Sequence, residues 1–454
     1  RWLEVSSSEG TEPRNDLWIA DLTQCAPTSP SFELVQGDVD AQTSISFGRD
    51  GRAYIFTDNN APRGTVLVTN PGSWNPNSWE TLIPEPQDAV LESVTLLDGE
   101  DLDQDQLMVV QTSHGVAEMT MHTATNGEKL YEVELPGAGT IGGPVEHIDG
   151  GPITWIVYTD HTTVPTIYEF DARTKELSLF ATPPGAVVAP DVHSELITYP
   201  SLDGTTVRMF VISPTGTPDQ PRPTILYGYG GFGIPLQPGY SAAILAWVES
   251  GGVWAIANLR GGGEEGEEWH RAGMLANKQN VFDDFHAAAE YLIDKGWTTS
   301  NHLGIYGGSN GGLLVGAAMT QRPELFNAVV CVAPLLDMIR YVESELGPTW
   351  TVEYGDPADA EQFGWLHAYS PYHRVAQGTD YPATMFAIFD NDTRTDPMHG
   401  RKMAAAVQAA TIGSRPILVR TEGNVGHGAR SLNKSIEESA DTLTFMSHWT
   451  GLDD

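Results

Sequence analysis

The chain has 454 residues, of which 40% are hydrophobic and 19% charged, so it is long enough for about three domains and apolar enough to bury sizeable cores. Its 60 acidic residues outnumber its 24 lysines and arginines and give a formal net charge of −36. This charge argues against binding to nucleic acids or to anionic membranes, because both present negatively charged phosphates.

The sequence predicts neither a disulfide framework nor a transmembrane helix. Its two cysteines are Cys25 and Cys331, and the second lies in an apolar run that is typical of a buried thiol. No stretch reaches the roughly 18 apolar residues of a transmembrane helix, and no signal peptide is recognised.

The chain begins at Arg1 in what reads as the middle of a strand, so we expect a fragment or processed product. We expect a cytoplasmic monomer, the alternative being a signal peptide removed with the missing end.

Residues 1–190 are rich in short strands and show no convincing long helix. A strand that ends in threonine and a small polar residue occurs at 54–58, 108–113 and 155–160, and a second short strand follows each copy. A repeat of about 50 residues with several strands per unit is typical of β-propeller blades. About four units are visible, which is the lower limit for a closed propeller. We therefore predict an incomplete propeller, with an irregular β-sandwich as the alternative.

Residues 191–454 alternate short apolar strands with helical patterns, which is typical of an α/β domain with a parallel sheet. The clearest helix is predicted over 281–295, where apolar residues recur at spacings of three and four. The predicted buried strands are 224–227, 253–257, 303–306, 328–332 and 384–388.

A glycine-rich segment, Gly-Gly-Ser-Asn-Gly-Gly at 307–312, lies between a predicted strand and a predicted helix. A serine at such a turn is typical of a nucleophile elbow, in which the sharp bend exposes the hydroxyl above the sheet. The neighbouring glycines let the chain approach closely. We therefore predict Ser309 as a nucleophile, the alternative being an ordinary glycine-rich turn.

A serine hydroxyl needs a base to take its proton, and in α/β-hydrolases an acid and then a histidine follow the serine along the chain. His427 lies in a loop between two glycines and is the predicted base, the alternative being a solvated loop residue. Spacing does not choose the acid, because three aspartates follow the predicted strand 384–388: Asp390, Asp392 and Asp396.

The oxyanion that develops on an attacked carbonyl also needs hydrogen-bond donors. The backbone N–H of Asn310, directly after the predicted nucleophile, is one candidate. The loop 227–232 is the second, since its glycines allow a tight fold and a tyrosine hydroxyl there could donate. The alternative is an aromatic loop that packs on the core.

Five stretches occur in one order across residues 194–454, namely LYGYGGF at 226–232, ANLRGGGE at 257–264, LANKQNVFDDF at 275–285, GGSNGGLL at 307–314 and GHG at 426–428. Together they resemble the prolyl oligopeptidase family of serine peptidases. Residues 1–190 resemble the later blades of that family's propeller more weakly. The resemblance implies an α/β-hydrolase catalytic domain at 191–454, preceded by an all-β, partial β-propeller domain at 1–190.

The resemblance also implies catalytic roles for individual positions. Ser309 would be the nucleophile and His427 the general base. The Asp-x-Arg arrangement of the family matches 392–394, so Asp392 would orient the imidazole. Tyr229 would donate to the oxyanion together with the N–H of Asn310.

Substrate contacts follow in the same way. Arg394 would bind a substrate carbonyl, Trp350 would stack on a proline ring, and Phe232 and Tyr354 would complete an apolar pocket. Thr395 stands where the family usually carries an apolar residue, so we expect one pocket wall to be more polar.

The resulting hypothesis is a serine endopeptidase that cleaves short proline-containing peptides after proline through an acyl-enzyme, with no metal or organic cofactor. The alternatives are another serine hydrolase of this fold, such as an oligopeptidase B-like peptidase, an acyl-peptide hydrolase or an esterase. A truncated, inactive chain that serves as a binding scaffold is the alternative from a different class.

Overall fold

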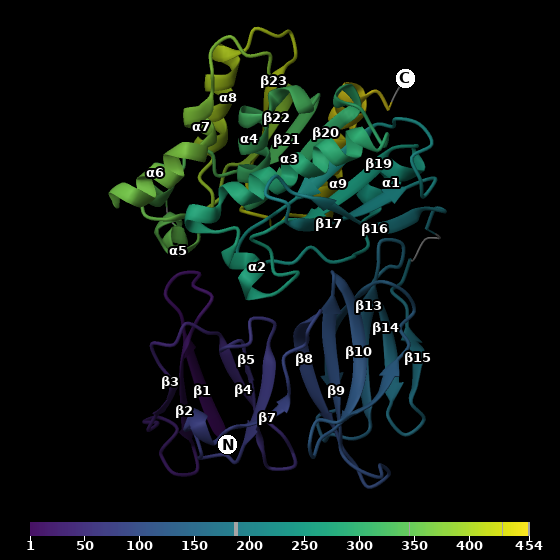
Figure 1. The fold of residues 1–454 in the computed structure, drawn as a ribbon, viewed down its shortest axis with the longest axis vertical. Coiled ribbons are helices and arrows are strands. Elements are labelled where there is room, and N and C mark those ends of the chain that lie inside the picture. Colours follow the sequence, from purple (N-terminus) through teal and green to yellow (C-terminus); the bar gives the residue numbers. More distant parts are fainter. Residues whose placement is uncertain (186–188, 345, 429, 453–454) are drawn as a thin grey trace. The chain divides into compact units, whose positions relative to one another are not determined.

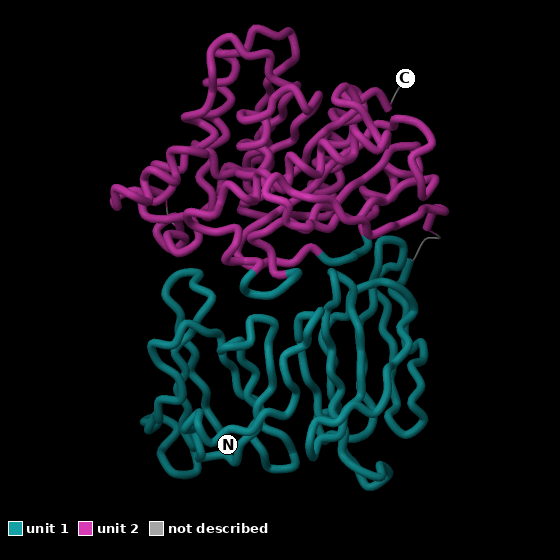
Figure 2. The backbone as a smooth tube through the Cα atoms, in the orientation of Figure 1, with its two compact units in different colours: residues 1–188, 237–240, 264–268 teal, residues 189–236, 241–263, 269–454 magenta. Residues whose placement is uncertain are grey.

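The computed structural model describes residues 1–185, 189–344, 346–428 and 430–452. It divides into two compact units, shown in different colours in Figure 2. The first contains residues 1–188 with the short segments 237–240 and 264–268, and the second contains the rest of the chain from residue 189 onward. No helix in these described ranges is long and apolar enough to cross a membrane.

The first unit is built, over its described residues, from four antiparallel sheets that follow one another along the chain (Figure 1). Each sheet pairs strands that are consecutive in sequence, as in the blades of a propeller. The strands are β1 (Trp2–Ser7), β2 (Asp16–Asp21) and β3 (Glu33–Gln36); β4 (Thr43–Phe47), β5 (Ala53–Thr57), β6 (Thr65–Thr69) and β7 (Glu80–Ile83); β8 (Val90–Leu97), β9 (Gln106–Ser113), β10 (Val116–Thr123) and β11 (Lys129–Val133); and β12 (Thr140–Glu146), β13 (Ile153–Thr159), β14 (Thr166–Asp171) and β15 (Glu176–Ala181). A short 3-10 helix, η1 (Pro76–Ser78), precedes β7.

The threonine repeat corresponds to one position in these sheets. Thr57, Thr112 and Thr159 lie at or next to the end of β5, β9 and β13, each of which is the second strand of its four-stranded sheet. Apolar side chains of neighbouring sheets pack against each other, and separate core clusters join sheets that are adjacent in sequence. The predicted blade-like, all-β architecture is confirmed.

The second unit contains one eight-stranded sheet in the order β16-β17-β19-β18-β20-β21-β22-β23 within the described residues. An antiparallel hairpin, β16 (His193–Pro200) and β17 (Thr206–Ser213), forms one edge. The other strands are parallel: β18 (Thr224–Gly228), β19 (Val253–Asn258), β20 (Leu303–Gly308), β21 (Ala328–Val332), β22 (Ala383–Phe389) and β23 (Ile417–Glu422). β19, β21 and β22 are buried at every position, as expected for strands covered on both faces.

Helices cover both faces of this sheet (Figure 1). α1 and α9 contact each other, and α9 lies against β20 and β21. α4 contacts the same two strands, and α3 packs on α4 and β16. The helices are α1 (Ala242–Glu249), α2 (Glu267–Arg271), α3 (Gln279–Asp294), α4 (Asn310–Gln321), α5 (Thr351–Tyr354), α6 (Ala360–Tyr369), α7 (Pro371–Arg374), α8 (Met398–Ala410) and α9 (Leu432–Thr450). Short 3-10 helices connect them: η2 (Leu275–Asn277), η3 (Ser300–His302), η4 (Pro323–Leu325), η5 (Tyr341–Glu343) and η6 (Gly347–Trp350). The predicted α/β-hydrolase fold is confirmed.

Candidate active site

Ser309 occupies the turn between β20 and α4, at the carboxyl end of a central strand. Its backbone has φ +57° and ψ −119°, a strained conformation for a residue with a side chain. Its N–H donates to the carbonyl of Val332 at 2.9 Å, which anchors the turn to the next strand. A Cβ at Gly307 would collide with the carbonyl of Gly311, so the flanking glycine is needed for the close approach of the chain.

Asp392 and His427 come together from two loops that follow neighbouring strands, β22 and β23. Oδ2 of Asp392 lies 2.7 Å from Nδ1 of His427, and the Asp392 side chain is buried. Oδ1 accepts the backbone N–H groups of Arg394 and Thr395 at 2.9 and 3.0 Å. Burial opposes ionisation, but the His427 contact and these N–H donors outweigh it and hold the pKa of Asp392 below its usual value.

The two other candidate aspartates make different contacts. Asp390 pairs with Arg401 at 2.9 Å on the surface. Asp396 accepts the backbone N–H of Met398 at 2.8 Å, at the start of α8. Among the three, Asp392 is the carboxylate that contacts His427.

Thr395 lies beside this pair and is almost fully buried. Its hydroxyl is 2.9 Å from Oδ2 of Asp392, 2.9 Å from the carbonyl of Ala333 and 3.2 Å from Nδ1 of His427. The hydroxyl that was expected to make a pocket wall polar is therefore engaged with the protein itself. Its contacts support the orientation of the aspartate and the imidazole.

Tyr229 lies on the loop after β18, close to the elbow. Burial raises the pKa of its phenol to about 12, while a hydrogen bond with the Ser309 hydroxyl and the charge of Arg394 act in the opposite direction. The phenol therefore keeps its proton at neutral pH and can donate a hydrogen bond. Asn310 is the first residue of α4, where backbone N–H groups and the helix dipole favour a negative charge.

The side chain of Asn310 also has a role that the sequence did not reveal. Its Nδ2 donates to the carbonyl of Tyr229 at 2.6 Å, and its Oδ1 accepts the hydroxyl of Tyr354 at 2.8 Å. The residue after the predicted nucleophile thus ties the elbow to the tyrosine loop and to α5. The sequence predicts a role only for the backbone N–H of Asn310, because nothing in the local pattern indicates these distant partners.

The predicted aromatic residues form one cluster. The ring centroid of Phe232 lies 6.5 Å from that of Trp350 and 5.5 Å from that of Tyr354, with near-perpendicular planes in both pairs. Tyr354 is completely buried, so it supports the cluster from behind, whereas Trp350 is half-buried. The side chain of Arg394 is exposed, and its backbone N–H binds Asp392. The aromatic cluster and the exposed Arg394 both belong to the unit that carries Ser309.

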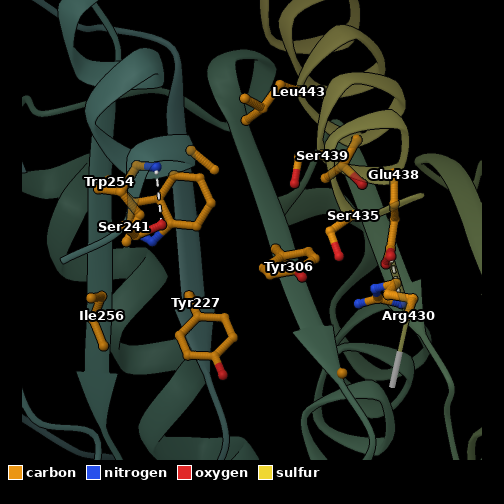
Figure 3. A pocket seen from close by; sticks show the side chains of 14 residues that line it. Tyr227, Ser241, Trp254, Ile256, Tyr306, Arg430, Ser435, Glu438, Ser439 and Leu443 are labelled. Atoms are coloured by element: carbon orange, nitrogen blue, oxygen red, sulfur yellow. Dashed lines mark hydrogen bonds and ion pairs between the residues drawn. The ribbon is translucent and has the colours of Figure 1, made fainter. Parts of the chain in front are cut away.

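A separate cavity of about 370 Å³ lies between α1 and α9 (Figure 3). Tyr227, Trp254 and Tyr306 contribute aromatic side chains to it from three adjacent strands, and an ion pair of Arg430 and Glu438 forms part of the opposite wall. Gly308 lines it as well, so the cavity lies next to the strand that leads into the elbow. Ser309, Asp392 and His427 do not line it.

Two family models match the chain. Residues 238–453 match the model of the prolyl oligopeptidase family, and residues 1–183 match that of the N-terminal β-propeller domain of prolyl oligopeptidase. The chain is 36% identical to a prolyl endopeptidase of Elizabethkingia miricola, over all of this chain and 62% of the relative. It is 33% identical to a prolyl endopeptidase of Dictyostelium discoideum, over 98% of this chain and 60% of that protein. The chain therefore spans less than two thirds of these relatives.

Solved structures show the same fold. A structure from a study of two prolyl endopeptidases matches with a TM-score of 0.91 and 40% identity, over 99% of this chain and 65% of that one. Prolyl oligopeptidase B from Galerina marginata, bound to a 25-residue macrocyclization substrate, matches with a TM-score of 0.91 and 28% identity, over 99% of this chain and 63% of that one.

Proposed function

Because the chain belongs to the prolyl oligopeptidase family, we propose that the protein is a serine endopeptidase that hydrolyses short peptides on the carboxyl side of proline. The observation that carries this proposal is the 2.7 Å contact between Asp392 and His427, in the same unit as a strained, glycine-flanked Ser309. A histidine that contacts a buried carboxylate, in the unit that carries a serine at such a turn, supports nucleophilic catalysis.

In the proposed reaction, the hydroxyl oxygen of Ser309 attacks the carbonyl carbon of the proline residue and His427 accepts the hydroxyl proton. Since Nδ1 faces Asp392, Nε2 is the nitrogen that takes this proton. Asp392 keeps the imidazole oriented and stabilises its positive charge. His427 then gives the proton to the leaving amine, which leaves an acyl group on Ser309.

A water molecule next attacks the acyl-enzyme with His427 as the base, releases the peptide ending in proline and returns the proton to Ser309. During both steps the oxyanion accepts hydrogen bonds from Tyr229 and from the N–H of Asn310. The raised pKa of Tyr229, about 12, supports this assignment because the donor stays protonated.

The aromatic cluster supports the proposed preference for proline. The flat indole ring of Trp350 would stack on the proline ring, with Phe232 at its edge, because ring stacking adds to the burial of apolar area. Arg394, which is exposed and close enough to Tyr229 to affect its pKa, would donate to a substrate carbonyl.

The decisive experiment is a panel of fluorogenic peptides that differ only in the residue before the cut: proline, alanine or arginine. We expect cleavage after proline to dominate, and labelling of Ser309 by a fluorophosphonate. Preferential cleavage after arginine would assign the chain to a basic-specific peptidase instead. Labelling without cleavage of any peptide would point to an esterase, and the absence of both would leave a binding scaffold.

We further propose that the protein acts as a monomer in the cytoplasm. Its net charge of −36 supports the monomeric state, since like-charged surfaces repel each other. Light scattering coupled to gel filtration tests the monomer, where a mass near 49.2 kDa is expected for this chain. Fractionation of the source cells tests the location.

A further inference from the structure

Three charged or titratable side chains form a buried network beside the aromatic cluster: Lys278, Glu353 and His270. Each is at most 3% exposed. Nζ of Lys278 lies 3.1 Å from Oε1 of Glu353, and Nε2 of His270 lies 2.8 Å from Oε2 of the same carboxylate. We call these three residues the Glu353 network.

The network binds the backbone of the loop that carries Tyr229 and Phe232. Nζ of Lys278 donates to the carbonyl of Gly230 at 2.9 Å. The carboxylate of Glu353 accepts the backbone N–H of Phe232. Two charged groups therefore hold two peptide groups on the segment 230–232, directly after the proposed oxyanion donor.

This loop needs such support because Phe232 has a φ of +58°, in the left-handed region that side chains disfavour. A non-glycine residue persists there only when its surroundings impose the conformation. Both hydrogen bonds involve an ionised partner, and such bonds are shorter and stronger than neutral ones. The Glu353 network supplies both of these hydrogen bonds, and Glu353 itself lies in α5.

The network also contacts the aromatic cluster. Glu353 belongs to α5, between Trp350 at the end of η6 and Tyr354. Nζ of Lys278 lies 5.3 Å from the centroid of the Tyr354 ring, within the range of a cation–π contact. Glu353 therefore lies next to Tyr354 in α5, three residues after Trp350, and its carboxylate binds the loop that carries Phe232.

Stability alone does not explain a buried ion pair. Removing charges from water costs as much as their attraction returns, and well-packed apolar residues often serve equally well. Apolar side chains, however, cannot form hydrogen bonds with the Gly230 carbonyl and the Phe232 N–H. The network therefore contributes geometry rather than net stability.

We propose that Lys278, Glu353 and His270 are positioning residues that set the distance between the Tyr229–Phe232 loop and α5, and thereby determine both the selectivity for proline and the placement of the oxyanion donor. This inference rests on the proposed function, because it assigns the aromatic cluster to proline and Tyr229 to the oxyanion.

Two variants and one control test the proposal in the full chain. Glu353→Gln keeps the shape and an acceptor for Phe232 but removes the charge. The double variant Lys278→Met with Glu353→Met removes both hydrogen bonds of the network to the loop and leaves no unpaired charge on these two residues. Lys402→Met is the matched control, because Lys402 also pairs with a buried carboxylate, that of Asp337, away from the loop.

Three quantities are measured for each protein: kcat and KM for peptides with proline or alanine before the cut, the rate of fluorophosphonate labelling, and the thermal unfolding midpoint. A misplacement of about 1 Å costs about 100-fold in rate. We therefore expect kcat/KM for the proline peptide to fall about tenfold in Glu353→Gln and about 100-fold in the double variant. The ratio of proline to alanine cleavage should fall in parallel, while Lys402→Met changes only the midpoint.

A folded double variant with the wild-type selectivity and labelling rate would overturn the proposal, and so would a control that loses selectivity to the same extent. If the double variant does not fold, Glu353→Gln decides by the same two readouts. If the wild-type chain shows no preference for proline, the proposed function fails. The rate of fluorophosphonate labelling alone then tests the network. This rate should still fall in Glu353→Gln and in the double variant, and should stay unchanged in Lys402→Met.

Discussion

The hydroxyl of Tyr354 donates a hydrogen bond of 2.8 Å to Oδ1 of Asn310, while Nδ2 of the same asparagine donates to the carbonyl of Tyr229 at 2.6 Å. One side chain next to Ser309 therefore connects the elbow, the loop after β18 and α5. Tyr354 and Asn310 are both buried, so water does not readily replace either partner. Losing one of them therefore lowers the free energy of unfolding.

Replacing Tyr354 with Phe tests this connection. The substitution leaves Oδ1 of Asn310 without its donor in a buried site, which costs about 1–3 kcal/mol of unfolding free energy. We also expect kcat to fall several-fold with the proline peptide, because the loop of Tyr229 loses part of its support. Urea unfolding and steady-state kinetics measure the two effects. An unchanged unfolding free energy would contradict a stabilising role for this hydrogen bond.

Ser309→Ala removes the proposed nucleophile. We expect kcat to fall by several powers of ten, because the members of a catalytic triad act as a unit. Fluorophosphonate labelling should disappear while the thermal midpoint stays near the wild-type value, since the hydroxyl is small and half-buried. Turnover close to the wild-type rate would refute the assignment.

Tyr229→Phe removes the proposed side-chain donor to the oxyanion. Loss of one such donor costs about 100- to 1000-fold in kcat, and KM should change little because the donor acts on the transition state. The pKa of Tyr229, about 12, means that this donor does not ionise up to about pH 10. An activity that falls between pH 8 and 10 in the wild type and not in Tyr229→Phe would contradict that assignment.

Thr395 offers a pair of matched variants. Thr395→Val removes the hydroxyl that lies 2.9 Å from Asp392, and Thr395→Ser retains it. A hydrogen bond to a charged group is worth about 1.5–3 kcal/mol, so we expect kcat to fall by roughly a factor of ten or more in the valine variant. The serine variant should stay within a few-fold of the wild type. Equal activities would indicate that the hydroxyl does not support the aspartate.

Acid should destabilise the second unit through its buried histidines. Burial lowers the pKa of His286 and of His399 to about 4, whereas an unfolded histidine titrates near about 6.5. Between these values the unfolded chain binds more protons, so the unfolding free energy falls as the pH falls, by up to about 1.4 kcal/mol per pH unit for each histidine. Below about pH 4 the effect of both groups is complete.

His286→Leu checks this pH dependence, since it removes one of the histidines whose pKa burial lowers. Urea unfolding at several values between about pH 4.5 and 7 should give a smaller slope of the unfolding free energy in the variant. Identical slopes would mean that His286 is protonated in the folded protein.

The sequence alone determined the features that depend on neighbouring residues. The repeat of threonine-ended strands predicted the blade-like sheets, and apolar residues at spacings of three and four predicted the helix found at α3. The glycines around Ser309 predicted the strand-turn-helix at β20 and α4. These patterns are local because strand and helix periods, and the conformational freedom of glycine, are set within a few residues. The stretches in family order across 194–454 predicted the family, which the comparisons confirmed.

Only the tertiary structure decided which distant side chains meet. Spacing could not separate Asp392 from the two nearby aspartates, because the choice depends on where the loops after β22 and β23 place His427. The contact between Asn310 and Tyr354 joins residues 44 positions apart, and the contact between Lys278 and Glu353 joins residues 75 apart. Such pairs depend on the packing of whole elements, and a charged residue that is buried and paired looks in sequence like one that is solvated. The physical reason is that hydrogen bonds and ion pairs act over a few ångströms in space, whatever their separation along the chain.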